Sequence, residues 1–270
     1  GVSMASKKVR ASLRKAPLGW LVTLVWVLGF LIVWNGIALV FQLAGQAGTK
    51  FPYIHDLLKW AFSPAYDGGG IWRATCITLS VFASGLVIGF LIGAAFAVIM
   101  SACLPVEKVG YPLLLLSQMI PMLGLAPIIV SMVGDFSKAK LVMSAYMTFF
   151  PVAANFFAGL QSVDDQRKEL LMMSGASQAT VYRKLMIPAA APSLFIGLKL
   201  ATPSAFAAVI FTEVLYPQNG GIGGEILNSQ YGNDWELCWG YIFMAVTVAV
   251  LLFYAASFVE KLVIRWKSVD

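Results

Sequence analysis

Three polar side chains lie inside long apolar stretches of this sequence. Lys199 and Glu213 are in the run 188–215, and Gln118 is in another run beside Pro121. An ionised group inside hydrocarbon costs roughly 3 kcal/mol even on permissive scales, so such residues are functional candidates. We therefore take Gln118, Lys199 and Glu213 as candidates for lining a solute pathway.

Each of these candidates has two interpretations. Lys199 and Glu213 are about 21 Å apart along a helix, too far for a direct ion pair, so each needs another partner. Lys199, near mid-membrane, either neutralises an anion in transit or braces a neighbouring helix. Glu213, near the outer end, either lines the outer mouth or contacts another protein on that side. Gln118 either bonds a neighbouring helix or faces the pathway.

The segment 162–188 is too polar to cross a membrane and has the pattern of two short helices. Ser162 and Asp165 have capping-box spacing, which predicts the start of the first helix. Gly175 predicts its end, since glycine adopts the left-handed conformation that closes many helices.

The second short helix should begin after Ser177, a good N-cap residue. Val181 and Leu185 are four residues apart and share one face, and Pro188 should end the amphipathic stretch. An apolar face on a polar loop needs a partner: the protein's own helices, lipid, or a groove on another polypeptide.

The composition indicates what must position these residues. The 270 residues are 59% hydrophobic and 12% charged with a mean hydropathy of +0.80, which excludes a soluble domain. Apolar runs long enough to cross hydrocarbon predict six transmembrane helices. They are centred on Trp20–Phe41, Thr75–Cys103, Tyr111–Val133, Ala139–Leu160, Pro188–Leu215 and Cys238–Val259. In the second, Gly85, Gly89 and Gly93 predict a close helix contact.

The distribution of Lys and Arg predicts the orientation. With the N-terminus inside, the inner segments hold thirteen of these residues and the outer segments five, Lys140 among the latter. Cytoplasmic loops carry the excess of positive charge, so both termini should be cytoplasmic. The net charge of +6 then needs no nucleic acid partner.

Cofactor chemistry finds no support in the sequence. There is no G-x-x-x-x-G-K-[ST] motif for nucleotide phosphates, and the three cysteines are isolated in apolar surroundings. We expect no metal site, no catalytic residues and no cofactor in this chain.

The loop resembles the signature of permease subunits of ATP-binding cassette (ABC) importers. Glu169-Leu-Leu, three residues, Gly175, nine residues and Leu185-Met-Ile-Pro188 is similar to E-A-A, three residues, G, nine residues and I-x-L-P. The spacing matches at each anchor, and the replacements are apolar. The resemblance covers roughly residues 72–267 and is strongest to the nitrate, sulfonate and taurine branch.

The resemblance implies a type I permease fold, an all-α membrane protein with about six transmembrane helices. Residues 1–70 would form a cytoplasmic N-terminus, a first helix and an outer segment, and residues 71–267 the permease core with the coupling loop 162–188. In the family this loop docks into a cleft on the ATPase. The implied ATPase contacts are Glu169, Leu170, Leu171, Gly175, Ala176, Val181, Leu185 and Pro188.

The resemblance also implies partners and a location. These are two cytoplasmic ATPase subunits that bind ATP and Mg, a second permease copy, and an extracytoplasmic solute-binding protein, in the bacterial inner membrane. The chain itself would not be an enzyme. Nitrate, sulfonates or taurine are the first expectation for the solute, with a pyrimidine, a riboflavin-like vitamin or an aromatic acid as the alternative. A secondary transporter or channel without an ATPase, or a scaffold, are the competing classes.

Overall fold

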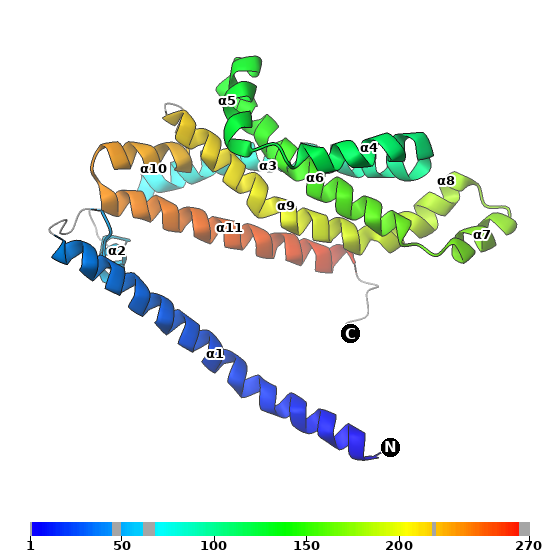
Figure 1. Ribbon diagram of the computed structural model, residues 1–270, viewed down its shortest axis with the longest axis horizontal. Helices are drawn as coiled ribbons and strands as arrows, with labels where there is room; N and C mark the ends of the chain where they lie inside the picture. The colour runs from blue at the N-terminus through cyan, green and yellow to red at the C-terminus, as the bar shows by residue number, and fades with distance from the viewer. Residues whose placement is uncertain (1, 45–49, 62–67, 218–219, 265–270) are drawn as a thin grey trace. The chain divides into compact units, whose positions relative to one another are not determined.

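The computed structural model describes residues 2–44, 50–61, 68–217 and 220–264, and this described part is helical without strands. The elements are α1 (Val2–Leu43), α2 (Ile54–Ala61), α3 (Gly68–Ala102), α4 (Leu104–Ser117), α5 (Met122–Val133), α6 (Phe136–Gln161), α7 (Asp165–Met173), α8 (Gln178–Val181), the π-helical η1 (Tyr182–Met186), α9 (Ile187–Leu215), α10 (Ile222–Tyr231) and α11 (Trp235–Val263) (Figure 1). The chain divides into two units, Gly1–Asp67 with Ser229–Gly240, and Gly68–Asn228 with Tyr241–Asp270.

Five helices of the described chain are long and apolar enough to cross a membrane. These spans are Leu21–Leu43, Gly70–Ala102, Phe136–Gln161, Gln178–Leu215 and Trp235–Val263. They confirm five of the six predicted transmembrane helices. Their apolar surfaces remain largely exposed in the isolated chain, which suits contact with lipid.

The third predicted span is not one helix. The chain leaves α4 at Gln118 and enters α5 at Pro121, whose extended backbone (ψ 121°) cannot belong to a helix. Proline has no N–H to continue the α4 hydrogen-bond ladder, and it biases the residue before it away from helical geometry. The prediction of a continuous helix over 111–133 was therefore wrong.

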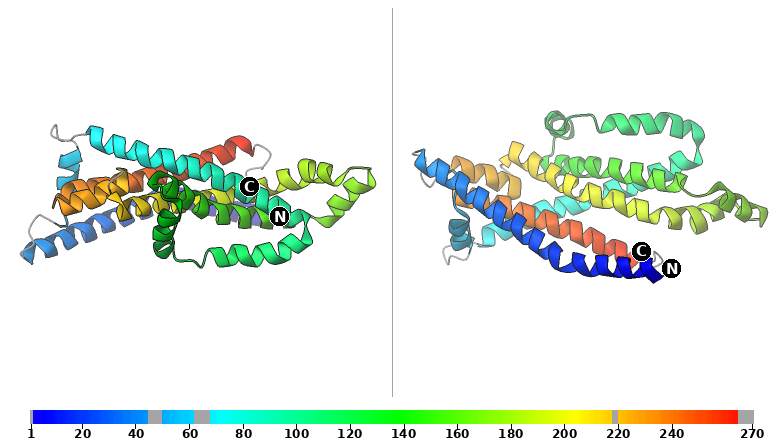
Figure 2. Two further views of the ribbon diagram at one scale, coloured as in Figure 1. Left: turned by 90° about the horizontal axis from the view of Figure 1, so that it is seen from above. Right: turned by 60° about the horizontal axis from the view of Figure 1, so that its bottom comes forward.

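Helices α3, α6 and α9 pack side by side and form the centre of the larger unit (Figures 1 and 2). The predicted close contact of Gly85, Gly89 and Gly93 is confirmed, since all three face α6. A Cβ on Gly93 would lie 2.7 Å from the Phe149 carbonyl oxygen. Small residues at this face bring the two backbones together, and this packing fixes the side chains that α3 and α6 share.

The polar loop contains two short helices, as predicted, but the first begins differently. Asp164, not Ser162, caps α7, and its carboxylate accepts a hydrogen bond from the Gln166 N–H at 3.0 Å. Ser162 instead forms the C-cap of α6, because that helix runs as far as Gln161. The capping box was therefore wrong. Gly175 has φ +81°, which confirms the left-handed turn between the helices.

The second helix of the loop does not end at Pro188. Ser177 caps α8 as predicted, but α8, η1 and α9 form one continuous helix from Gln178 to Leu215. The wide π turn of η1 ends at Met186, two residues before Pro188, which occupies one of the first two positions of α9. Proline is tolerated at a helix start, so here it marks a change of winding and not an end.

The smaller unit is held by aromatic side chains. The Trp34 Nε1–H donates to the Pro52 carbonyl and the Trp239 Nε1–H to the Lys50 carbonyl, both at 3.1 Å. The two indole rings meet edge to face with centroids 4.9 Å apart. These contacts attach the segment after α1 to the start of α11.

Candidate functional site

A buried ion pair joins the beginning of α6 to the end of α9. The Lys140 ammonium lies 3.0 Å from Glu213 Oε1, and the two side chains are 1% and 0% exposed. Charges so deeply buried are stable only when they are paired and hydrogen bonded. Glu213 therefore has the partner that the sequence demanded, but it does not line an open outer mouth in this structure.

The same carboxylate holds the start of α10. Its Oε2 accepts from the Thr78 hydroxyl at 2.9 Å and from the Gly223 N–H at 3.1 Å. Thr78 in turn accepts from the Ile222 N–H at 2.9 Å. Only glycine fits at 221, because its φ is +97° and a Cβ would run into the Glu213 carboxylate. The network thus connects α3, α6, α9 and α10.

Sequence reasoning missed Lys140, which it assigned to an outer segment. Lys140, Ser144 and Thr148 are four residues apart and all buried, so they form one stripe on α6 that faces the bundle. This spacing was a readable signal for a buried polar face. The assignment failed because Lys140 was counted among the charges of an outer segment, and the helix face on which it lies was not considered.

Lys199 also has a partner. Its ammonium lies 2.6 Å from Glu260 Oε2, and the two side chains are 23% and 16% exposed. Glu260 belongs to the last turn of α11, so the Lys199 ammonium, carried near the middle of α9, lies beside the C-terminal end of α11. The pair braces α9 against α11 and leaves no net charge there.

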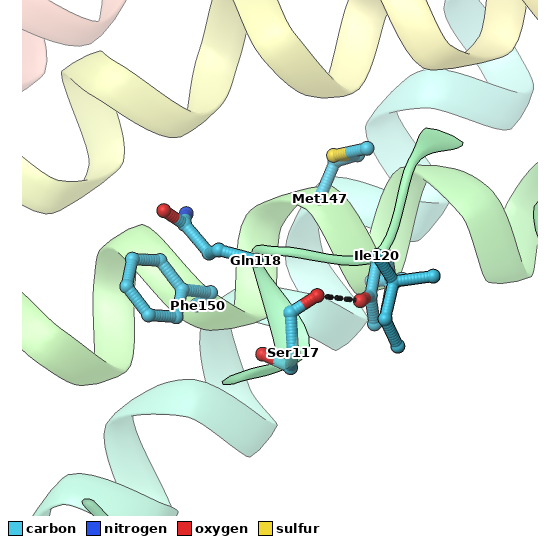
Figure 3. A pocket seen from close by; sticks show the side chains of 6 residues that line it. Ser117, Gln118, Ile120, Met147 and Phe150 are labelled. Atoms are coloured by element: carbon cyan, nitrogen blue, oxygen red, sulfur yellow. Dashed lines mark hydrogen bonds between the residues drawn. The ribbon is translucent and has the colours of Figure 1, made fainter. Parts of the chain in front are cut away.

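Gln118 lines a pocket at the break between α4 and α5. The other lining residues are Ser117, Ile120, Tyr146, Met147 and Phe150 (Figure 3). The Tyr146 hydroxyl donates to the Ser117 carbonyl, which closes the end of α4 onto α6. The Gln118 side chain is exposed and makes no hydrogen bond within the described chain. The pocket is uncharged, with polar and aromatic groups side by side.

The coupling loop divides into an inner and an outer surface. Val181 is buried, and Leu171, Ala176 and Leu185 pack against the same core cluster of α3, α4, α6 and α9 residues. Pro188 is half-buried at the start of α9. These residues attach the loop to the protein's own helices.

The outer surface of the loop is apolar as well as charged. Leu170 is 67% exposed and Met173 is 87% exposed, and Glu169 and Gly175 are exposed beside them. Met173 was not among the predicted contacts, although it follows Leu170 on one face of α7. Among the predicted contacts, therefore, only some are free to meet a partner.

One hydrogen bond connects the loop to α3. The Tyr182 and Ser101 hydroxyls lie 3.1 Å apart. Tyr182 is the first residue of η1, and Ser101 lies in the last turn of α3. The π-helical turn is thus tied to a second spanning helix at the point where the loop joins α9.

Comparison with known proteins agrees with this architecture. Residues 85–268 match the model of the binding-protein-dependent transport system inner membrane component. The chain belongs to this family. It is therefore a permease subunit of a binding-protein-dependent ABC importer, a multi-pass protein of the inner membrane. The resemblance seen in the loop sequence is confirmed.

Curated relatives cover most of the chain. The formylaminopyrimidine transport permease protein of Halalkalibacterium halodurans is 30% identical over 71% of this chain and 76% of its own length. The riboflavin transport system permease protein of Chloroflexus aurantiacus is 26% identical over 85% and 87%. A putative aliphatic sulfonates transport permease protein of Escherichia coli is 26% identical over 86% and 89%. The relatives share the permease role and differ in solute.

Solved structures show the same fold. A methionine ABC transporter in an inward-facing conformation matches with a TM-score of 0.61 at 17% identity, covering 73% of this chain and 99% of that one. A bacterial ABC transporter involved in alginate import matches with a TM-score of 0.62 at 14% identity, covering 97% and 100%. The type I importer permease fold is confirmed.

Proposed function

We propose that this permease forms a translocation pathway with a second copy of itself and couples it to two cytoplasmic ATPase subunits. A solute-binding protein delivers the solute from outside, and ATP and Mg are bound by the ATPase. The family supports the kinds of partner, and the lack of a nucleotide-binding motif in the sequence supports a separate ATPase.

The outer surface of the coupling loop carries this proposal. Leu170 and Met173 project from a helix whose first five residues are polar or charged, and exposed apolar side chains rimmed by polar ones are typical of a docking surface. A short helix with such a face fits a groove on a partner protein. The loop is firmly attached to α9 through Val181, so a displacement of the docked helix reaches the spanning helices.

The orientation follows from the same interface. An ATPase in the cytoplasm requires the loop to be cytoplasmic, and with it both termini. The excess of Lys and Arg in the inner segments supports this orientation.

The solute belongs to the class of small polar molecules. Relatives named for sulfonate and nitrate transport support an anion of that kind. Relatives named for formylaminopyrimidine and riboflavin transport support a heterocyclic solute. In the described chain, the cations of α6 and α9 beyond the first turn of each helix are paired with carboxylates. This lack of an unpaired positive charge favours the heterocyclic solute.

Co-purification tests the docking surface. Leu170→Asp and Met173→Asp should each reduce recovery of the ATPase with the tagged permease by about tenfold or more, because each places a charge in an apolar contact. Gln178→Asp is the matched control. It adds the same charge at the exposed first residue of α8, where a carboxylate suits the helix N-terminus, and removes no apolar side chain.

Membrane insertion is checked in the same preparations by the yield of folded, monodisperse permease. Gly175→Arg and Glu169→Lys should also lose ATPase association or transport-coupled hydrolysis while insertion is kept. Full association and coupled hydrolysis in all four loop variants would refute the docking role of this surface.

A further inference from the structure

The start of α10 is inserted among the spanning helices and is held there by polar contacts. Ile222 is 0% exposed, and Gly223 and Gly224 beside it are buried. The Ile222 N–H donates to the Thr78 hydroxyl at 2.9 Å and the Gly223 N–H to the Glu213 carboxylate at 3.1 Å. The first N–H groups of a helix have no acceptor within that helix. Here two other helices supply the acceptors, Thr78 from α3 and Glu213 from α9.

The fit of this segment depends on the absence of side chains. A Cβ on Gly223 would run into the Ile210 carbonyl of α9, and one on Gly224 would lie 2.9 Å from the Pro217 carbonyl oxygen. Glycine has more conformational freedom to lose than any other residue, so such a segment stays in place through its contacts and not through its own stiffness. Loss of those contacts should therefore release it.

A polar cavity of about 430 Å³ lies beside the segment. Its lining includes the charged side chains of Arg73 and Glu225 together with the backbone of Gly221. Gly221 also lies against the Glu213 carboxylate, which is 0% exposed. The start of α10 therefore separates a cavity suited to water from the buried Lys140–Glu213 pair.

The two acceptors move only with the helices that carry them. One continuous helix runs from Gln178 to Leu215, so Glu213 is carried by the same helix that begins in the coupling loop, roughly 50 Å away along its axis. A hydrogen bond is lost once its donor and acceptor are more than about 3.5 Å apart. A displacement of α9 relative to α3 by roughly 1 Å therefore breaks one of the two contacts that hold α10.

We propose that residues 221–224 form an outer plug, which closes the outer end of the bundle in this structure and is released when α9 moves relative to α3. This rests on the proposed function, which places α10 outside and moves α9 through the coupling loop. Release would let water from the cavity reach the Lys140–Glu213 pair, and the lost hydrogen bonds would be replaced by bonds to that water. Thr78 is then a positioning residue, because it joins the plug to Glu213.

Hydrogen exchange tests the plug in the unchanged protein. The purified permease–ATPase complex is placed in lipid nanodiscs, and exchange of the amides of residues 221–224 is followed by mass spectrometry with and without ATP and Mg. Exchange should be severalfold faster with ATP and Mg, because closure of the ATPase moves the docked loop and α9 and so opens the contacts of the plug. The amides of residues 144–156, in the middle of α6, are the internal reference and should not change.

Thr78→Val tests the contact that holds the plug. It removes the acceptor of the Ile222 N–H, so the released state gains population and ATP hydrolysis without binding protein or solute should rise about threefold or more. Thr75→Val is the matched control, since Thr75 is also buried on α3 but donates to the Ile71 carbonyl of its own helix. Thr78→Ser keeps the hydroxyl and should hydrolyse ATP at the rate of the unchanged protein. A merely structural defect would instead lower hydrolysis together with the yield of folded complex.

Two results would overturn the plug proposal. One is exchange at 221–224 that is the same with and without nucleotide in the unchanged complex. The other is ATP hydrolysis by folded Thr78→Val complex that is unchanged or lower. The nucleotide comparison needs no variant, so it decides even if Thr78→Val does not fold. Failure of the ATPase to co-purify would instead count against the proposed function, so the two ideas fail separately.

Discussion

Removing one member of the Lys140–Glu213 pair should be far more damaging than removing both. Glu213→Gln keeps the shape of the side chain but leaves the Lys140 ammonium, 1% exposed, without a carboxylate. The ammonium nitrogen would still lie 5.3 Å from the centroid of the Phe136 ring, a much weaker partner than a carboxylate. Loss of one partner of a buried pair costs about 3–5 kcal/mol in free energy of unfolding.

Lys140→Met should cost less, near the lower end of that range at about 3 kcal/mol. The Glu213 carboxylate would keep its hydrogen bonds from Thr78 and Gly223, whereas in the described part of the chain the Lys140 ammonium donates to no acceptor besides Glu213. The double variant Lys140→Met with Glu213→Gln should be more stable than either single variant, because no buried charge is left unpaired. The coupling between the two sites, which is the sum of the two single costs minus the cost of the double variant, should therefore exceed the larger single cost of about 3–5 kcal/mol.

The assay is reversible unfolding of the purified permease in lipid bicelles, read as the fraction folded. A change of about 3 kcal/mol alters the ratio of folded to unfolded protein by roughly 100-fold, well above the error of the method. Lys138→Met is the matched control. It removes the same charge two residues earlier on α6, at an exposed position, and should change stability by less than about 0.5 kcal/mol.

Two results would refute this reasoning. One is a Glu213→Gln variant no less stable than Lys138→Met, which would mean that the buried ammonium finds another partner. The other is a double variant destabilised by the sum of the single effects, which would mean that the two charges do not interact.

Further predictions concern the turn before α10, the η1 turn and the second ion pair. Gly221→Ala should destabilise the permease more than Gly134→Ala in the same unfolding assay, because both have positive φ but only at 221 does a Cβ meet the carboxylate. Tyr182→Phe removes the hydrogen bond to Ser101, so solute-stimulated ATP hydrolysis should fall severalfold while ATPase recovery by co-purification stays normal; unchanged stimulation would contradict a role in transmission. Lys199→Met should cost only about 1 kcal/mol, since both members of its pair are partly exposed, and a loss as large as that of Lys140→Met would contradict this.

Several local features could be predicted from the sequence because they depend on neighbouring residues alone. The glycines at 85, 89 and 93 lie on one helix face by their spacing, and they do meet α6. Ser177 and Gly175 define a helix start and a left-handed turn through their own backbone and side chain. The loop motif likewise indicated the family, since its anchors are defined by spacing.

Other features could not be predicted because competing local solutions have similar energies. Pro121 interrupts a helix, whereas Pro188, Pro192 and Pro203 are accommodated within one. The outcome depends on whether packing and a nearby wide turn compensate for the lost hydrogen bond, which the chain near each proline does not reveal. The sequence rules therefore left the third span undivided, although it breaks before Pro121, and ended the loop helix at Pro188, although it continues into α9.

The sequence by itself determined that this protein is a bundle of membrane helices with a polar loop built for a partner. Hydrophobic length and motif spacing are local properties of the chain, so they need no knowledge of packing. Only the tertiary structure decided which charges are free. Lys140 pairs with Glu213 and Lys199 with Glu260, across 73 and 61 residues of sequence. Buried charges are stable only beside a partner, and helix packing selects that partner. Packing therefore places Lys199 and Glu213 in ion pairs that join helices, and it leaves the uncharged Gln118 side chain exposed.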